Sequence, residues 1–300
     1  MKQFLKLLPL VVILILTIIF KQSITEFIID KFIFTRQIYI QKPNEYAVNY
    51  DFQYVQTTDD FYAKDYQQLL NILYTALNNG NSYFYFFCEY EQCENDVDKL
   101  TESNQFVNIN NYVHPYNSYR KLYVTINSLG KVSVTIDKSY DENDILAVNK
   151  EIEHIMDSIL TENMSTKEKI TTFHDYIIDN TKYDTEYINK NLNDIDNVSH
   201  KANGPLFYHK ALCGGYADVM AVFLNKLKIP NYRISSESHI WNFVKLDNQW
   251  LHLDLTWDDP VTTNGQDIRQ DTFLLITTEQ LQNLKTGYHD FNHSIYLETN

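Results

Sequence analysis

The fold of this chain is decided by two stretches, residues 211–224 (A-L-C-G-G-Y-A-D-V-M-A-V-F-L) and residues 238–260 (S-H-I-W-N-F-V-K-L-D-N-Q-W-L-H-L-D-L-T-W-D-D-P). The first predicts a helix that begins at Cys213 and is apolar on several faces, which is typical of a buried helix. The second predicts a β-hairpin, because apolar and polar residues alternate on both sides of Asp247-Asn248, a pair suited to a two-residue turn. Cysteine, histidine and aspartate along these stretches are the residue types of a nucleophile, a base and a group that orients the base.

Cys213 lies in the first turn of the predicted helix. Unpaired backbone N–H groups and the positive end of the helix dipole meet there, so this position favours a thiolate and can stabilise an oxyanion. The alternative is an inert buried cysteine, a frequent environment for a free thiol. The hairpin favours the reactive cysteine, because it carries partners for it.

The hairpin is predicted to consist of strands at residues 238–246 and 249–256, and the two-residue turn sets its register by pairing Leu246 with Gln249. Counting back from that pair puts His239 and Asp254 on one face as diagonal neighbours, about 7 Å apart between their backbones. Asp254 is then placed to fix the tautomer of His239 while the other ring nitrogen faces Cys213. We therefore interpret His239 as the base.

Other candidates for the base or for a metal site are weaker. His252 shares the face of His239 but lies nearer the turn, and His209 precedes Cys213 on a loop. No set of cysteines and histidines has zinc-ligand spacing, so neither a metal nor another cofactor is predicted. The remaining polar residues are interpreted as structural, with a capping turn at Asp258 and Asp259 and surface or packing positions at His289 and His293.

Four motifs in the second half of the chain are similar to those of the transglutaminase-like superfamily, within the papain-like cysteine fold, in its bacterial membrane-anchored type. Three are residues 211–217 (A-L-C-G-G-Y-A), 238–244 (S-H-I-W-N-F-V) and 250–260 (W-L-H-L-D-L-T-W-D-D-P), and a weaker one is residues 173–184 (F-H-D-Y-I-I-D-N-T-K-Y-D). The resemblance extends over residues 165–291. It implies an α+β fold in which the helix that begins at the cysteine is buried against an antiparallel sheet.

The resemblance also implies roles for individual residues. Cys213 is expected to be the nucleophile, His239 the base and Asp254 the residue that orients the base. Tyr183 is the candidate oxyanion partner. The side chains expected at the cleft are Trp241, Tyr216 and His252. The chain departs from the family at His209-Lys210, where related bacterial sequences tend to have a glycine, so the cleft entrance is expected to differ in shape.

The function implied by this family is chemistry on amide bonds of proteins or peptides through a thioester on the cysteine. Hydrolysis by a peptidase or amidase and acyl transfer of the transglutaminase type both occur in the family, and the sequence does not choose between them. The alternative is a catalytically inactive binding or scaffold module at the cell surface.

The region before this domain is predicted to be a small α/β accessory region at residues 23–163, followed by the transglutaminase-like domain at 164–300. Ser165 or Thr166 is suited to cap the first helix of the second domain. Periodicity predicts helices at 61–78 and 145–160, a strand at 82–88 and a hairpin at 122–136. The polar stretch 184–203 is predicted to be a long surface loop.

Residues 7–20 carry no charge and follow Lys2 and Lys6. Their length favours an uncleaved signal anchor at residues 1–22 that contacts the membrane and leaves the domain outside; the alternatives are a cleaved signal, with a secreted protein, and a buried helix. In an oxidising compartment Cys88 and Cys93 can form a disulfide, and otherwise they are a reduced, partly buried pair.

The overall charge bears on the choice of partner. The formal net charge is −14, and the sequence has no stripe of Lys and Arg. Both properties argue against a nucleic-acid partner, whose phosphates require clustered basic residues. The predicted partner is a protein or peptide substrate.

Overall fold

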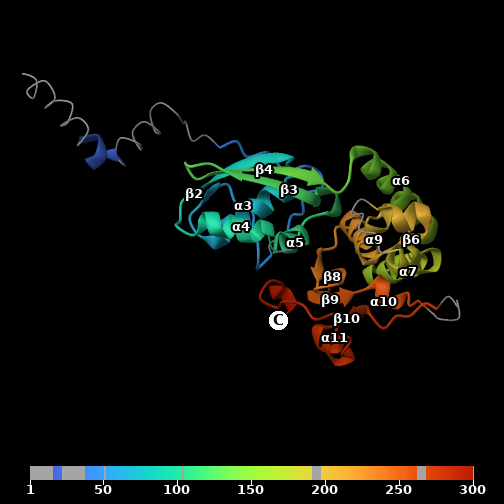
Figure 1. The fold of residues 1–300 in the computed structure, drawn as a ribbon. Helices are drawn as coiled ribbons and strands as arrows, with labels where there is room; N and C mark the ends of the chain where they lie inside the picture. The colour runs from blue at the N-terminus through green and yellow to red at the C-terminus, as the bar shows by residue number, and fades with distance from the viewer. Residues whose placement is uncertain are drawn as a thin grey trace, which may run out of the picture. The chain divides into compact units, whose positions relative to one another are not determined.

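The computed structural model describes residues 16–21, 38–50, 52–102, 105–190, 197–261 and 268–299. The chain divides into two units, Met1–Tyr39 and Ile40–Asn300, and the second contains both larger sheets (Figure 1). The predicted anchor at residues 1–22 lies mostly outside the described residues. Within the described ranges, no helix has the length and apolar character needed to cross a membrane. The predicted domain boundary at residues 163 and 164 falls inside the second unit and stays a prediction.

A four-stranded sheet of order β1-β2-β4-β3 forms the first part of the second unit. Its strands are β1 (Tyr62–Ala63), β2 (Tyr83–Cys88), β3 (Tyr119–Ile126) and β4 (Lys131–Lys138). One face is lined by α3 (Tyr66–Asn78), α4 (Cys93–Glu102) and α5 (Gln105–Asn110), as Figure 1 shows. The strand β4 buries every second residue, so its apolar side chains face a core while the polar ones between them are more exposed. The hairpin predicted at residues 122–136 is confirmed.

The cysteines of this part are joined. Cys88 at the end of β2 and Cys93 at the start of α4 form a disulfide, with their Cα atoms 5.6 Å apart. All three cysteines of the chain lie in the described ranges, and Cys213 is the one with a free thiol.

The second sheet, of order β10-β9-β8-β7, packs against α9 (Cys213–Lys226). Its strands are β7 (Asn231–Ser235), β8 (Ile240–Leu246), β9 (Gln249–Leu253) and β10 (Leu274–Ile276). Every residue of α9 from 215 to 224 is buried, because α7 (Thr166–Asn180) covers another side of it, where Phe173 stacks on Phe223 with ring centroids 3.9 Å apart. The buried helix that begins at the cysteine and the mixed α+β fold are therefore confirmed.

The hairpin of β8 and β9 has the predicted register, with Leu246 opposite Gln249 and pairing that continues to Asn242 opposite Leu253. Asp247 and Asn248 both have positive φ angles, 49° and 64°, as a tight two-residue turn between strands requires. The predicted extension of the second strand to residue 256 is wrong. The strand ends at Leu253 because Asp254 is the N-cap of a short helix, α10 (Leu255–Asp258).

The elements between the two sheets differ in part from the predictions. Ser165 is confirmed as a cap, because its hydroxyl and the Glu168 carboxylate form a capping box at the start of α7. The stretch predicted to be a loop, residues 184–203, contains α8 (Thr185–Asn189) and the 3-10 helix η3 (Val198–His200). The remaining elements are η2 (Pro115–Asn117), α6 (Glu142–Ile159), β5 (Lys182–Tyr183), η4 (Gly204–Tyr208), β6 (Lys210–Ala211), α11 (Thr278–Leu284) and η5 (Leu297–Thr299).

A buried polar network connects α9 to the first part of the unit. The Asp218 carboxylate on α9 accepts hydrogen bonds from Arg233 on β7 and from the Tyr140 hydroxyl, the latter at 2.8 Å. The Arg233 guanidinium also donates to the carbonyl oxygen of Asn110, at 2.7 Å. Because these groups are buried and bonded to one another, they fix the position of the cysteine helix relative to the end of α5.

Candidate active site

Cys213 is the first residue of α9, as predicted. Leu212 is the N-cap, and its side chain makes no capping hydrogen bond. The first-turn N–H groups point away from the helix and carry the positive end of its dipole. The thiol therefore lies where an anion is stabilised.

A steric constraint explains why the two residues after the cysteine are glycines. A Cβ atom at Gly214 would lie 2.9 Å from the carbonyl oxygen of His200, and one at Gly215 would lie 2.5 Å from that of Ser199. Both obstacles are backbone atoms, which cannot rotate away. The sequence C-G-G therefore lets the start of α9 approach the backbone of η3, where the Leu212 N–H donates to the Ser199 carbonyl at 2.7 Å.

His239 lies just before β8, with Asp254 on one side of its ring. Its Nε2 is 2.6 Å from Asp254 Oδ2, and its side chain lines the same cleft as Cys213. Because Nε2 is taken by the carboxylate, Nδ1 is the nitrogen left for the thiol. The ring stacks on Trp241, with centroids 5.5 Å apart, and this contact fixes its plane.

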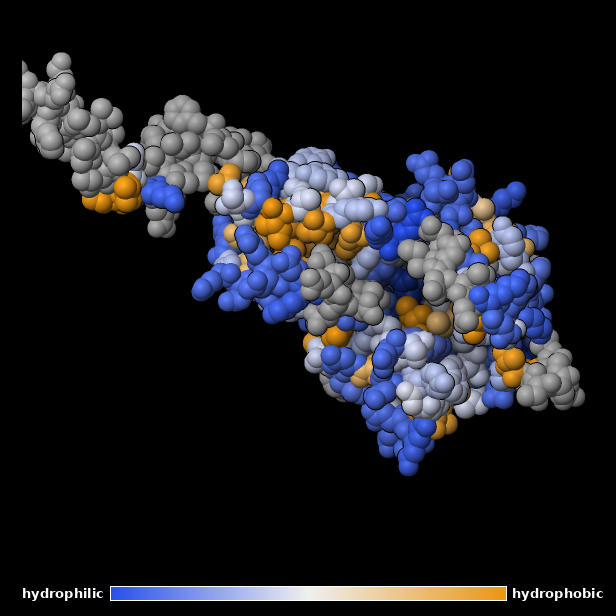
Figure 2. Space-filling model, in the orientation of Figure 1, coloured by the Kyte–Doolittle hydropathy of each residue, from blue (hydrophilic) through white to orange (hydrophobic). Residues whose placement is uncertain are grey.

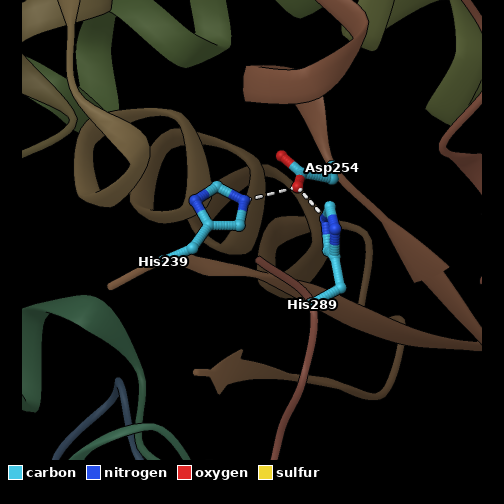
Figure 3. Close-up of side chains that lie close together, drawn as sticks. All are labelled: His239, Asp254 and His289. Carbon is cyan, nitrogen blue, oxygen red and sulfur yellow. Dashed lines mark hydrogen bonds and ion pairs between the residues drawn. The ribbon is translucent and has the colours of Figure 1, made fainter. Parts of the chain in front are cut away.

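Asp254 is held by four hydrogen bonds. Its Oδ1 accepts from the backbone N–H groups of Thr256, at 2.9 Å, and Trp257, at 3.3 Å, because Asp254 caps α10. Its Oδ2 accepts from His239, at 2.6 Å, and from His289, at 2.8 Å (Figure 3). The orientation of the carboxylate is therefore fixed at both oxygens.

His239 and Asp254 are a buried pair, and each strongly shifts the pKa of the other. Burial acts to lower the pKa of His239, but the charge of the Asp254 carboxylate, its hydrogen bond to the ring and the nearby Cys213 side chain outweigh burial and raise the pKa to about 10. Burial acts to raise the pKa of Asp254, but the His239 charge and the bonds from His239 and His289 hold it well below its usual range. An imidazolium and a carboxylate therefore face each other at neutral pH.

His289 is the part of the site that sequence reasoning missed, because it was interpreted as a surface or packing residue. Its side chain is only 3% exposed and donates to Asp254. It follows α11 in a segment with no strand or helix periodicity, so no local pattern connected it to the hairpin.

Tyr183 is brought next to the start of α9 by a short parallel pairing of β5 with β6, in which it lies opposite Ala211. Burial raises the pKa of Tyr183 to about 12, and the charges of Cys213, Asp184 and Asp254 add to this rise. The phenol is therefore close to the thiol, and its role as oxyanion partner stays a prediction. At the departure from the family pattern, His209 has a φ of 53°, in the left-handed region that glycine adopts most readily.

The three side chains expected to line the cleft are buried instead. Trp241, Tyr216 and His252 are each 1% exposed. Trp241 Nε1 donates to His252 Nδ1 at 3.0 Å, and burial lowers the pKa of His252 to about 3, so this imidazole is neutral. The C-terminal segment covers this face of the sheet, where Phe291 contacts both rings. The hairpin pattern alone could not show that the C-terminal segment packs on this face.

A cleft of about 830 Å³ lies in front of Cys213 and His239. Figure 2 shows that the surface of the second unit is hollowed on the face in view. Glu237 and Asp290 are exposed in its wall, and within the described residues neither has an ion-pair partner. No Lys or Arg is among its described lining residues, which also include Asn108, His200, Ser235, Ser236, Ser238, Ile240, Asn292 and Tyr296. The charged side chains of the described lining are therefore acidic, and Ile240, Phe291 and Ile295 give the cleft an apolar part.

The group of His239, Asp254 and His289 also has the residue types of a metal site, with potential ligand atoms within 4.8 Å of one another. In the structure, however, both Nε2 atoms face the same oxygen at 2.6 and 2.8 Å, which requires a proton on each nitrogen. A metal ligand would need those lone pairs free. The contacts are therefore those of a hydrogen-bonded cluster, and the absence of a metal stays a prediction.

Comparisons with known proteins agree with the resemblance seen in the sequence. Residues 153–255 match the core model of the transglutaminase-like superfamily. No curated protein matches the chain significantly. Two solved structures are similar to it. One is described as a TGase, with 16% identity and a TM-score of 0.36 over 64% of this chain and 54% of that one. The other is a candidate cysteine protease from Cytophaga hutchinsonii, with 10% identity and a TM-score of 0.28 over 50% of this chain and 65% of that one.

The chain therefore spans between about half and two thirds of each of those structures. The family match covers α9, the hairpin and the residues Cys213, His239 and Asp254. Residues 153–255 are similar to the core of the transglutaminase-like superfamily.

Proposed function

We propose that the protein is a cysteine enzyme that acts on amide bonds of proteins or peptides, with Cys213 as nucleophile, His239 as base and Asp254 as the residue that orients the base. The observation that supports this most is the position of His239, which is bonded to Asp254 at 2.6 Å and lines one cleft together with Cys213. That cleft is large enough for a peptide segment.

In the first step, the Cys213 thiolate attacks the carbonyl carbon of the amide and forms a C–S bond. The negative charge moves to the carbonyl oxygen, which the first-turn N–H groups of α9 and the Tyr183 hydroxyl stabilise. The C–N bond then breaks, and His239 gives the proton on Nδ1 to the leaving amine. The product is a thioester on Cys213 and a free amine.

In the second step, a nucleophile attacks the thioester and His239 takes its proton. With water the product is a carboxylic acid, and with a primary amine it is a new amide. In both cases the C–S bond breaks, and the Cys213 thiolate and the protonated His239 return. Asp254 keeps its proton-accepting contact with Nε2 throughout, so His239 transfers protons through Nδ1 alone.

We further propose that the enzyme works outside the cytoplasm, anchored by residues 7–20 or secreted. The disulfide of Cys88 and Cys93 supports an oxidising compartment. The uncharged run at residues 7–20 supports export.

The test is turnover by the wild type and by C213A with β-casein as substrate, with and without a fluorescent primary amine. Release of peptides identifies hydrolysis, and incorporation of the amine identifies acyl transfer. We expect C213A to lose all turnover while its thermal unfolding is unchanged. Turnover that survives in C213A contradicts the proposal, and a wild type without turnover favours the inactive binding module.

A further inference from the structure

A single oxygen atom, Asp254 Oδ2, receives two imidazole groups in the core of the site. His239 Nε2 lies 2.6 Å from it and His289 Nε2 lies 2.8 Å from it (Figure 3). We propose that His289 is a positioning residue of the reaction, which holds the Asp254 carboxylate in the place where it orients His239. This inference rests on the proposed function.

The protons of this cluster follow from its contacts. Asp254 is ionised, because its partners hold its pKa well below the usual range, and an ionised carboxylate only accepts hydrogen bonds. The Nε2 atom of His289 therefore carries a proton. Its Nδ1 lies 2.7 Å from Thr286 Oγ1, and in the neutral ring this nitrogen accepts, so the Thr286 hydroxyl donates. Thr286 thus selects the tautomer in which His289 donates to Asp254.

Packing holds the His289 ring in this position. The ring stacks on Phe273, with centroids 5.0 Å apart, and meets Trp241 and Trp257 at 4.8 and 5.1 Å. Its side chain is 3% exposed and that of Asp254 2%, so both lie away from solvent. Water is therefore kept from Oδ2, and a carboxylate in dry surroundings acts more strongly on His239.

The contribution of His289 differs from that of α10. The N–H groups of Thr256 and Trp257 hold Oδ1, so without His289 the other oxygen would depend on His239 alone. His239 changes its protonation state during the reaction, and its attraction to the carboxylate weakens when it is neutral. A second donor on Oδ2 keeps the carboxylate oriented in both states.

The experiment compares H289F, which keeps a ring but removes the donor, with H289Q, whose amide can reach the same oxygen. The matched control is H293F, since His293 is an exposed histidine of the same segment that bonds Thr299 instead. The probe is iodoacetamide at about pH 6, where a thiolate paired with an imidazolium reacts and an ordinary thiol does not. Each variant is also assayed for kcat and KM with β-casein and for thermal unfolding.

In H289F we expect Cys213 to be alkylated about tenfold more slowly and kcat to fall about tenfold, with KM unchanged. This is the effect of losing one hydrogen bond to a charged group. H289Q should restore most of that rate, and H293F should match the wild type. A purely structural role would lower the unfolding temperature of H289F and H289Q alike without restoring the rate in H289Q. If H289F does not fold, a comparison of T286V with T286S tests the same hydrogen bonds, which run from Thr286 through His289 to Asp254.

The outcomes separate the two proposals. If Cys213 of the wild type is alkylated no faster than a free thiol, the proposed function itself is overturned. A wild type that alkylates fast, together with an H289F that is folded and equally fast, overturns only the role of His289.

Discussion

His239 and Asp254 are joined by a 2.6 Å hydrogen bond from Nε2 to Oδ2, although one precedes β8 and the other follows β9. The hairpin brings them together, and the N-cap geometry of α10 turns the carboxylate toward the ring. The imidazole is left with Nδ1 for the thiol. The chemistry of the site depends on this contact.

The exchange D254N tests the contact. An amide has one acceptor and one donor, whereas Asp254 receives donors at both oxygens, so either the rings or the α10 backbone would face an NH₂ group. We expect kcat to fall by roughly 10² to 10⁴-fold, in the range known for the orienting aspartate of a triad. Turnover of β-casein measures it, with D271N, at an exposed aspartate, as control. Equal turnover in D254N and D271N would contradict the assignment.

Stability should depend on pH through His239. Its pKa rises from 6.5 to about 10 in the folded protein. A folded-state pKa above the unfolded one means that the stabilisation is complete below about pH 6.5 and is lost as the pH rises toward 10. Urea unfolding of the wild type and of H239Q between these pH values measures it, because the difference cancels other titrating groups. We expect the difference in unfolding free energy to shrink with rising pH, and a constant difference would exclude this linkage.

The glycines after Cys213 should differ in their tolerance of a methyl group. In G215A the new Cβ meets the Ser199 carbonyl at 2.5 Å, while in G214A it meets the His200 carbonyl at 2.9 Å. We expect G215A to lose roughly 2 kcal/mol or more of stability, because backbone must move, and G214A to lose less. Chemical denaturation of both variants tests the order. If G215A is as stable as the wild type, η3 can move away from the new methyl group without loss of stability.

The charge of the cleft should select substrates. Glu237 and Asp290 have no ion-pair partner among the described residues, so a Lys or Arg near the scissile bond gains attraction there. We expect a peptide with Lys at that place to have a KM a few-fold lower, on the order of exposed charge pairs, than the same peptide with Glu. The double variant E237Q/D290N should lose the preference, whereas E162Q, an exposed glutamate elsewhere, should keep it. A preference that persists in E237Q/D290N refutes the role of these charges.

The sequence predicted the parts of the molecule that depend on local pattern. The helix that begins at Cys213 and the register of the hairpin follow from periodicity and from the Asp247-Asn248 turn, and both are confirmed. The end of the second strand was missed, since Asp254 acts as an N-cap and alternation continues through it by chance.

The contacts that were missed are long-range. His289 reaches Asp254 from a segment 35 residues away along the chain, and Phe291 covers Trp241 and His252 from the same segment. Nothing in the periodicity of residues 286–296 predicts which face they cover. The buried position of the three expected cleft residues could therefore not be predicted from the hairpin.

The central claim is that His239 activates Cys213, and the most direct measurement is the rate at which iodoacetamide alkylates Cys213 at about pH 6, in the wild type and in H239Q. The account predicts that the wild type reacts at least about tenfold faster than H239Q and than free cysteine. Equal rates for the wild type and H239Q would contradict it, because the imidazole would then not contribute to the reactivity of the thiol.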